Sequence, residues 1–213
     1  MLANFITVFR VFLSFIVVAL LMQKTACSYW VAFVLTAIVI CFDGLDGFVA
    51  RKLNQASKFG AMLDILCDRI VECIYWITFA CLGWLSLWIP LIVVTRGLVT
   101  DGIRSLEMEQ GYTAFGSSTM QQSKIAKFIV TSNFCRGTYA VTKAFAFAFL
   151  ILANFPNNEV LANKFSLFAY TCAYIAVVFC VVRGLPVVAE SRRFIENMMQ
   201  QKMSAPSQID ENS

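Results

Sequence analysis

The chain contains no histidine. Imidazole is therefore excluded as a general base and as a metal ligand, and acid–base chemistry falls to aspartate, glutamate, lysine, tyrosine or cysteine. None of the eight cysteines is spaced as Cys-x-x-Cys, and we expect them to act as small hydrophobic side chains. Charged residues make up only 14% of the chain. The carboxylates that interrupt the apolar runs are thus the first candidates for chemistry.

Hydrophobic residues make up 59% of the 213 residues, and the mean hydropathy is +0.72. A soluble globular domain is closer to about 45–50% apolar. A run of about 18 or more apolar residues can cross a bilayer as a helix, whereas open sheet edges cannot face lipid. The sequence therefore predicts an all-α, polytopic membrane protein. Its long apolar runs are residues 5–22, 29–41, 70–94, 145–155 and 167–182.

We expect one membrane domain over residues 1–190 and a polar cytoplasmic tail over 191–213. The first apolar run has no charged start, because Arg10 is its first charge, and we interpret it as a retained helix and not as a signal peptide. The sequence Asn-Phe-Pro-Asn-Asn at 154–158 breaks the chain before the last helix. The six expected transmembrane helices are residues 4–23, 28–52, 60–82, 87–108, 124–155 and 165–188.

Lysine and arginine gather at the ends of the even-numbered helices, whereas the odd-numbered ends hold only Lys24 and Lys164. The positive-inside rule then places both termini, and the segment 43–68, on the cytoplasmic side. We interpret the net charge of +4 as a membrane-surface signal. Aromatic and basic residues are not interleaved on a soluble domain, so we expect no nucleic-acid partner.

Four aspartates lie between residues 43 and 68. An ionised carboxylate in apolar surroundings costs roughly several kcal/mol unless a cation or hydrogen bonds compensate it. Residues three or four apart share a helix face, which groups Asp43 with Asp46 and Asp64 with Asp68. The short connection makes the two helices antiparallel neighbours, so the four carboxylates can converge. All-oxygen ligands suit Mg²⁺, Mn²⁺ or Ca²⁺, and four carboxylates make two ions plausible. Pairing with basic side chains in a helix bundle is the simpler alternative.

Two glycines lie on the acidic faces. Gly47 and Gly60 lack a Cβ, so a flat group can approach the helix backbone there. Arg51 can make a forked contact with phosphate oxygens. A divalent metal site, room for a base and a phosphate clamp together predict a nucleoside diphosphate pocket.

The pattern D-x-x-D-G-x-x-A-R, eight residues, then G-x-x-x-D-x-x-x-D resembles the signature of the CDP-alcohol phosphotransferases. The start of the chain, with Asn4, Thr7 and Arg10, also resembles the first helix of that family. The resemblance covers roughly residues 1–190. The matching signature positions are Asp43, Asp46, Gly47, Ala50, Arg51, Gly60, Asp64 and Asp68.

The resemblance implies phospholipid biosynthesis by a metal-dependent phosphatidyl transfer. An alcohol attacks the lipid-bearing phosphorus of CDP-diacylglycerol, CMP leaves, and Asp68 takes the proton of the alcohol. We expect a multi-pass homodimer of a bacterial inner membrane, in contact with membrane lipids. The implied ligands of two Mg²⁺ or Mn²⁺ ions are Asp43, Asp46, Asp64 and Asp68. The implied CDP-binding residues are Gly47, Ala50, Arg51 and Gly60.

A second polar set, on the fourth helix and at the start of the fifth, favours an anionic acceptor by charge pairing with its phosphate. The surrounding segment resembles phosphatidylglycerophosphate synthases, which use glycerol 3-phosphate. Ile65 and Arg69 depart from the commoner members of that group, so inositol or inositol phosphate stays as the nearest alternative acceptor. A cation cluster that only fixes topology is also possible. The candidate acceptor-phosphate residues are Arg96, Arg104, Lys124 and Lys127, beside Asp101.

Two other classes of protein use carboxylates within membranes. A membrane prenyltransferase also holds metal-bound pyrophosphate with acidic motifs, but those motifs would normally lie far apart in a longer chain. A cation transporter would leave Gly47, Gly60 and Arg51 without a role. We interpret Arg136, Lys143 and Arg183 as snorkelling or ion-paired residues.

Overall fold

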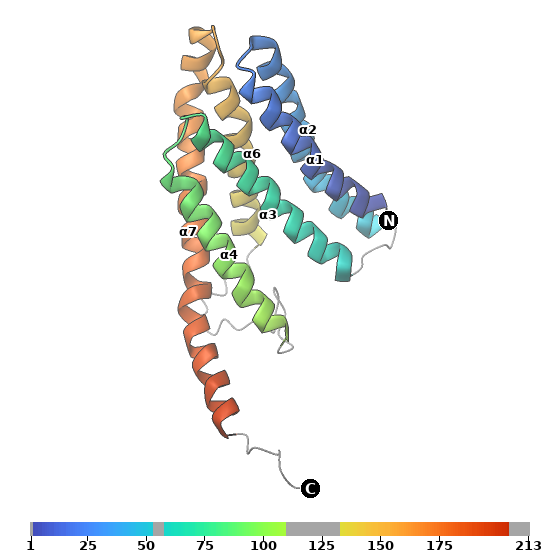
Figure 1. Ribbon diagram of the computed structural model, residues 1–213, viewed down its shortest axis with the longest axis vertical. Helices are drawn as coiled ribbons and strands as arrows, with labels where there is room; N and C mark the ends of the chain where they lie inside the picture. The colour runs from blue at the N-terminus through green and yellow to red at the C-terminus, as the bar shows by residue number, and fades with distance from the viewer. Residues whose placement is uncertain (1, 53–57, 110–132, 205–213) are drawn as a thin grey trace. The chain divides into compact units, whose positions relative to one another are not determined.

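The computed structural model describes residues 2–52, 58–109 and 133–204, and within these ranges the chain is helical apart from short turns. Figure 1 shows the helices in chain order. No strand occurs among the described residues, as the apolar pattern predicts. The helices are α1 (Leu2–Met22), α2 (Ala26–Lys52), α3 (Lys58–Cys81), α4 (Trp88–Glu109), α6 (Asn133–Ala153) and α7 (Glu159–Ser204).

The predicted bounds of the first four helices agree with the structure to within about two residues, the usual uncertainty of a helix end. The predicted start of the fifth helix at Lys124 lies outside the described residues. The prediction for the last helix is too short at both ends, because α7 begins at Glu159 and continues to Ser204. Hydropathy detects only the apolar part of a helix. The polar residues that follow are mostly good helix formers, so the helix outlasts the apolar run.

Polar caps and a left-handed residue set the ends of several helices. Asn157 has a positive φ of 58° in the predicted break, and Asn158 Oδ1 accepts a hydrogen bond from Leu161 N at 3.0 Å. This is the N-terminal capping that an asparagine before the first helical residue provides. In the turn between α1 and α2, Thr25 Oγ1 accepts a hydrogen bond from Ser28 N at 3.2 Å, immediately before α2 begins. These local contacts explain why the chain turns at the polar positions.

The helices group into two compact units, which we describe separately. The first comprises Met1–Thr95 and Thr138–Phe179, and the second comprises Arg96–Gly137 and Cys180–Ser213. In the first unit, α1 packs against both α2 and α3. Figure 1 shows α1 and α2 side by side. α1 therefore contacts both the helix that follows it in the chain and α3.

Aromatic rings fill the first unit between α3 and α6. Phe147 of α6 stacks on Tyr75 with centroids 4.7 Å apart, and it meets Trp76 edge-on at 5.1 Å. Tyr75 Oη also donates to Thr36 Oγ1 of α2 at 3.0 Å, so one buried side chain joins three helices. Satisfied buried hydroxyl groups of this kind fix the relative position of packed helices.

Large apolar side chains cover the outside of the helices. Phe5, Phe12 and Phe15 of α1 are each more than half exposed, and α7 exposes Val160 and Leu167 even further. A soluble monomer rarely exposes a contiguous apolar surface of this kind. Three segments of the described chain are long and apolar enough to cross a membrane: Asn4–Met22, Ala26–Asp43 and Glu159–Ala189.

Candidate active site

Three of the predicted aspartates meet around one arginine in the first unit. Arg10 of α1 donates through Nη1 to Asp43 Oδ1 of α2, and through Nη2 to Asp68 Oδ1 of α3 at 2.5 Å. The same Nη2 atom lies 3.7 Å from Asp64 Oδ1. The fork of one guanidinium thus spans carboxylates from two other helices, a geometry that lysine cannot provide.

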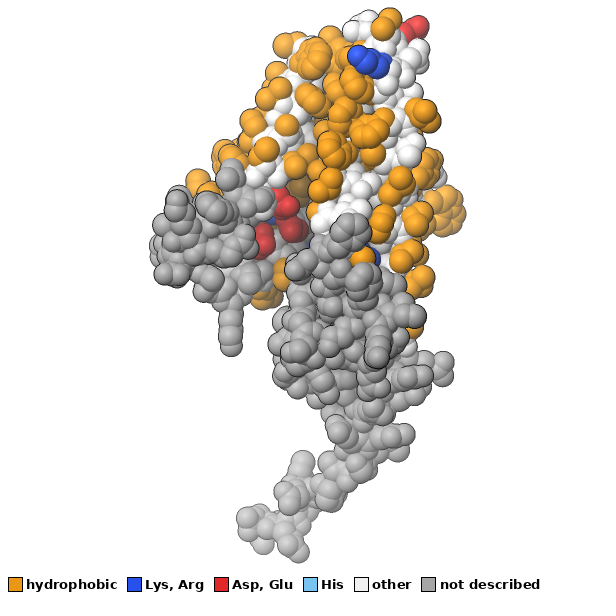
Figure 2. Space-filling view, turned by 180° about the vertical axis from the view of Figure 1, so that it is seen from behind, with side chains coloured by type: hydrophobic (Ala, Val, Ile, Leu, Met, Phe, Trp, Pro, Cys, Tyr) orange, Lys and Arg blue, Asp and Glu red, His pale blue; other side chains and the backbone are white. Residues whose placement is uncertain are grey.

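The arginine is buried, whereas its partners reach solvent. The Arg10 side chain is 1% exposed, while those of Asp43, Asp64 and Asp68 are 44% to 49% exposed. Asp43 and Asp68 are also close enough for a hydrogen bond between them. Figure 2 shows acidic side chains gathered at one place on a largely apolar face. The site is therefore an open, negatively charged surface with a buried cation beneath it.

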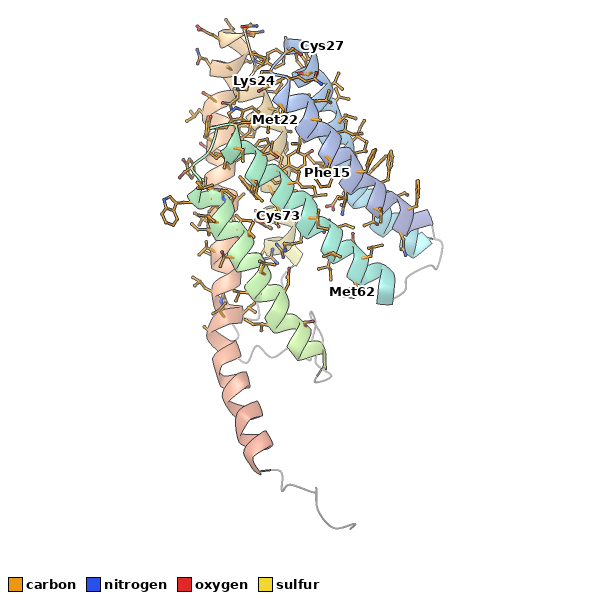
Figure 3. The ribbon with its side chains drawn as sticks, viewed as in Figure 1. Phe15, Met22, Lys24, Cys27, Met62 and Cys73 are labelled. Atoms are coloured by element: carbon orange, nitrogen blue, oxygen red, sulfur yellow. The ribbon has the colours of Figure 1, made fainter. Side chains whose placement is uncertain are left out.

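The local sequence explains why these groups converge. Asp64 and Asp68 lie one helical turn apart on α3, so their side chains share a face. Met62 and Cys73, labelled in Figure 3, bracket this stretch of α3. Asp43 lies on α2. Because α1 packs against both α2 and α3, it links the helix of Asp43 to the helix of Asp64 and Asp68. The packing of α1 therefore completes a site whose acidic residues come from a single sequence segment.

Several predicted residues can be placed by backbone alone. Asp46, Gly47, Ala50 and Arg51 continue α2, but their side chains lie outside the described part of the structure. Gly60 lies in the first turn of α3, four residues before Asp64. The grouping of Asp46 with the other aspartates, and the nucleotide pocket, remain predictions.

The predicted acceptor residues fall elsewhere in the chain. Lys124 and Lys127 lie outside the described residues, and of Arg104 only the backbone, in α4, is described. Arg96 belongs to the second unit. There its side chain lies against Gly184 of α7 so closely that a Cβ on Gly184 would be 2.7 Å from Arg96 Cγ. The Nε atom of Arg96 is buried without a hydrogen-bond partner among the described residues.

Sequence reasoning did not assign Arg10 to the site, although one signal pointed to it. Arg10 is the only charged residue of α1, and a cation inside an apolar helix needs an anionic partner. Glu72 was also missed; it lies four residues beyond Asp68 and forms a buried ion pair with Arg69 at 2.8 Å. Lys143 lies 3.8 Å from Glu72, which confirms the ion-paired interpretation of this lysine.

The donor set fits a hard divalent cation. Asp43, Asp64 and Asp68 offer only carboxylate oxygens, the ligands that Mg²⁺ and Mn²⁺ prefer. Arg10 already provides these carboxylates with a shared cationic partner, which shows that positive charge is stable at this position. Among the described side chains, no three acidic or cysteine residues lie close enough together to chelate one ion. A cation site therefore requires the carboxylates to shift, or Asp46 to contribute.

The chain belongs to the CDP-alcohol phosphatidyltransferase family, whose model matches residues 1–182. This membership confirms the resemblance inferred from the aspartate signature. It also separates the chain from membrane prenyltransferases and cation transporters.

Curated relatives carry the names of several enzymes of this family. A CDP-diacylglycerol–glycerol-3-phosphate 3-phosphatidyltransferase of Pseudomonas fluorescens is 32% identical over 116 residues, 53% of this chain and 59% of that protein. The enzyme of the same name from Wigglesworthia glossinidia brevipalpis is 33% identical over 112 residues, 50% of this chain and 59% of that protein. A phosphatidylinositol phosphate synthase of Corynebacterium glutamicum is 49% identical over 55 residues, 26% of this chain and 25% of that protein. The chain thus spans less than two thirds of the length of the curated relatives it matches.

Proposed function

We propose that this chain transfers a phosphatidyl group from CDP-diacylglycerol to the hydroxyl of glycerol 3-phosphate, with release of CMP, in phospholipid biosynthesis. Family membership supports the reaction class, and the names of two relatives support glycerol 3-phosphate as the acceptor. The observation that carries the proposal is the convergence of Asp43, Asp64 and Asp68 on one solvent-exposed spot. Arg10 offers these carboxylates one positive charge, so three aspartates on that spot carry more negative charge than the ion pairs balance.

Two divalent cations, Mg²⁺ or Mn²⁺, would be held by Asp43, Asp46, Asp64 and Asp68. When bound, such ions neutralise the charge that develops on the pyrophosphate as it is cleaved. The proposal assigns the nucleotide to Gly47, Ala50, Arg51 and Gly60, whose small side chains and single guanidinium suit a flat base and a phosphate. Membership in the family supports these assignments.

Asp68 is proposed as the general base. It would take the proton from the acceptor hydroxyl, whose oxygen forms a bond to the lipid-bearing phosphorus while the bond from that phosphorus to CMP breaks. Arg10 Nη2 donates a hydrogen bond to Oδ1 of Asp68, which restricts the orientations open to this carboxylate before substrate binds. A base with restricted orientation lowers the entropic cost of reaching the reactive geometry.

The acceptor phosphate is assigned to Arg96, Arg104, Lys124 and Lys127. The buried Nε of Arg96, which has no hydrogen-bond partner among the described residues, supports an anion at this residue. A phosphate oxygen would satisfy that donor with a charge-assisted hydrogen bond.

We also propose a multi-pass homodimer with six transmembrane helices in a bacterial inner membrane, with the site and the tail at 191–213 facing the cytoplasm. Support comes from three segments apolar enough to cross a membrane, a shorter apolar helix at Gly137–Ala153, and the exposed apolar side chains. The lysine and arginine distribution supports the orientation.

An acceptor competition assay tests the proposal. Purified protein in lipid nanodiscs with Mg²⁺ and CDP-diacylglycerol is offered glycerol 3-phosphate, inositol phosphate, inositol or serine, and CMP release is measured. We expect glycerol 3-phosphate to be preferred, and Asp68→Asn to abolish release. Glu159→Gln, a change of an exposed acid at the start of α7, is the matched control and should leave the rate unchanged. Absence of CMP release with every acceptor would refute the reaction class.

The second candidate is phosphatidylinositol phosphate synthesis by the same chemistry. The short but 49% identical match to the Corynebacterium enzyme favours it. Preference for inositol phosphate in the competition assay would establish this alternative and exclude glycerol 3-phosphate.

A further inference from the structure

Arg10 lies at the point where the proposed metal ligands meet. Its Nη1 atom donates to Asp43 Oδ1, and its Nη2 atom donates to Asp68 Oδ1 at 2.5 Å and lies 3.7 Å from Asp64 Oδ1. The one guanidinium therefore pairs with an oxygen of each described carboxylate that the proposed function assigns to a divalent cation. A side chain in that position either helps to hold the ions or competes with them for these oxygens.

The charges of the proposed site favour competition. Its four carboxylates, those of Asp43, Asp46, Asp64 and Asp68, carry four negative charges, which two divalent cations balance without a further cation. The Arg10 side chain is 1% exposed, and a buried cation beside a site that is already neutral is costly. The guanidinium is therefore stable at this position as long as the carboxylates are its own counter-ions.

The geometry of the contacts also fits a guanidinium better than a metal ion. Mg²⁺ holds its oxygen ligands at about 2.0–2.1 Å, which brings those oxygens close together around one point. Arg10 instead reaches Asp43 and Asp68 through two different nitrogens of its fork. Within the described part of the chain, no three acidic or cysteine side chains are grouped tightly enough for one ion. The carboxylates thus have the spacing that the arginine fork requires.

The two sides of the site allow a metal ion to take the place of the arginine. The three aspartate side chains reach solvent, so ions have access to them, whereas Arg10 approaches them from the buried side. Val17 and Leu21 of α1 are almost completely buried, and α1 packs against both α2 and α3. These contacts do not depend on the guanidinium, so they keep the helices together when it leaves the carboxylates.

We propose that Arg10 is the resident counter-ion of the metal site, and that divalent cations displace its guanidinium when they bind to Asp43, Asp64 and Asp68. The guanidinium compensates the carboxylates until the ions arrive, so metal binding is an exchange of cations. The affinity of the site for metal is then lower than that of the same carboxylates without Arg10. The inference rests on the proposed function, since it assumes that the aspartates bind metal.

Mn²⁺ binding to the full-length protein in nanodiscs, without substrate, tests the proposal by electron paramagnetic resonance. Arg10→Met removes the competitor, and we expect the Kd for Mn²⁺ to fall about tenfold or more, the factor that corresponds to one hydrogen bond to a charged group. If Arg10 instead orients the ligands, its removal should raise the Kd by about 10- to 100-fold. The two roles predict opposite signs, and a Kd that rises or stays the same overturns the proposal.

Two further variants keep the test decisive. Arg10→Lys retains the positive charge without the fork, and its Kd should lie between those of the wild type and Arg10→Met. If the methionine variant does not fold, a Kd for Arg10→Lys that is not below the wild-type value overturns the proposal. Lys24, labelled in Figure 3, follows the end of α1 at Met22, about 18 Å along the helix from Arg10. Lys24→Met removes the same charge there and should leave the Kd unchanged; an equal fall in Kd would show a general effect of charge and overturn the exchange.

The outcomes separate this inference from the proposed function. If the wild type binds Mn²⁺ and releases CMP, but Arg10→Met binds Mn²⁺ no more tightly, the exchange is refuted while the proposed function stands. If the wild type neither binds Mn²⁺ nor releases CMP, the proposed function fails and the exchange fails with it.

Discussion

Replacing Arg10 by methionine tests whether the buried guanidinium holds the aspartates together. Methionine keeps an unbranched, apolar stem in a position that is 1% exposed, but it removes every donor. Asp43 and Asp68 lose their hydrogen bonds to Arg10, and Asp64 loses its cation at 3.7 Å. The three carboxylates then lose the guanidinium that they share.

The expected cost follows from the burial of the two sides. Removing one partner of a fully buried ion pair costs about 3–5 kcal/mol, and a hydrogen bond to a charged group contributes about 1.5–3 kcal/mol. The aspartates are 44% to 49% exposed, so water screens them once they are released. We therefore expect the free energy of unfolding to fall by about 2 kcal/mol, which is within the range of about 1.5–3 kcal/mol for one hydrogen bond to a charged group. For a chain of this size that corresponds to a fall in Tm of about 4–8 °C.

The assay is thermal unfolding in nanodiscs, first with EDTA and then with Mg²⁺. A ligand at 100 times its Kd stabilises the folded state by about 2.7 kcal/mol, so bound ions can replace the lost guanidinium. We expect the difference in Tm between wild type and Arg10→Met to shrink when Mg²⁺ is added. Arg10→Lys keeps the charge but not the fork, and it should give an intermediate Tm in EDTA. Equal Tm values for wild type and Arg10→Met in EDTA would refute the reasoning.

Three further predictions follow from the described contacts. Gly184→Ala introduces a Cβ 2.7 Å from Arg96 Cγ, so the arginine must move. If Arg96 then loses one charge-assisted contact with the acceptor, worth about 1.5 kcal/mol, the KM for the acceptor should rise about tenfold or more. An equal rise in the KM for CDP-diacylglycerol would contradict the assignment of Arg96. Tyr75→Phe loses the 3.0 Å hydrogen bond to Thr36 and should cost about 1 kcal/mol of unfolding free energy; a changed kcat in CMP release would mean that this contact also shapes the site. EDTA should stop CMP release, and Mg²⁺ or Mn²⁺ should restore it whereas Zn²⁺ should not, because the proposed ligands are all oxygen; full activity in EDTA would exclude a metal-dependent reaction.

Local spacing was enough to predict part of the site. Asp64 and Asp68 share a face because any two residues four apart on a helix do, whatever the rest of the chain folds into. The long apolar runs likewise predicted helices, since a helix is the form in which a single segment satisfies its own backbone hydrogen bonds in lipid. The same runs placed the end of α7 too early. Hydropathy marks only the part of a helix that is apolar enough for lipid, whereas the helix itself continues as long as its residues have good helix propensity.

The sequence by itself determined the helical class, the family signature and the acidic face of α3, because each depends on residues close together in the chain. Only the tertiary structure decided which of the 17 lysines and arginines the carboxylates would meet. Arg10 reaches Asp43 and Asp68 across 33 and 58 residues of sequence, and Tyr139 reaches Glu72 across 67. Such contacts depend on how α1 and α6 pack against α3, and helix packing is set by the fit of whole surfaces that no local pattern records.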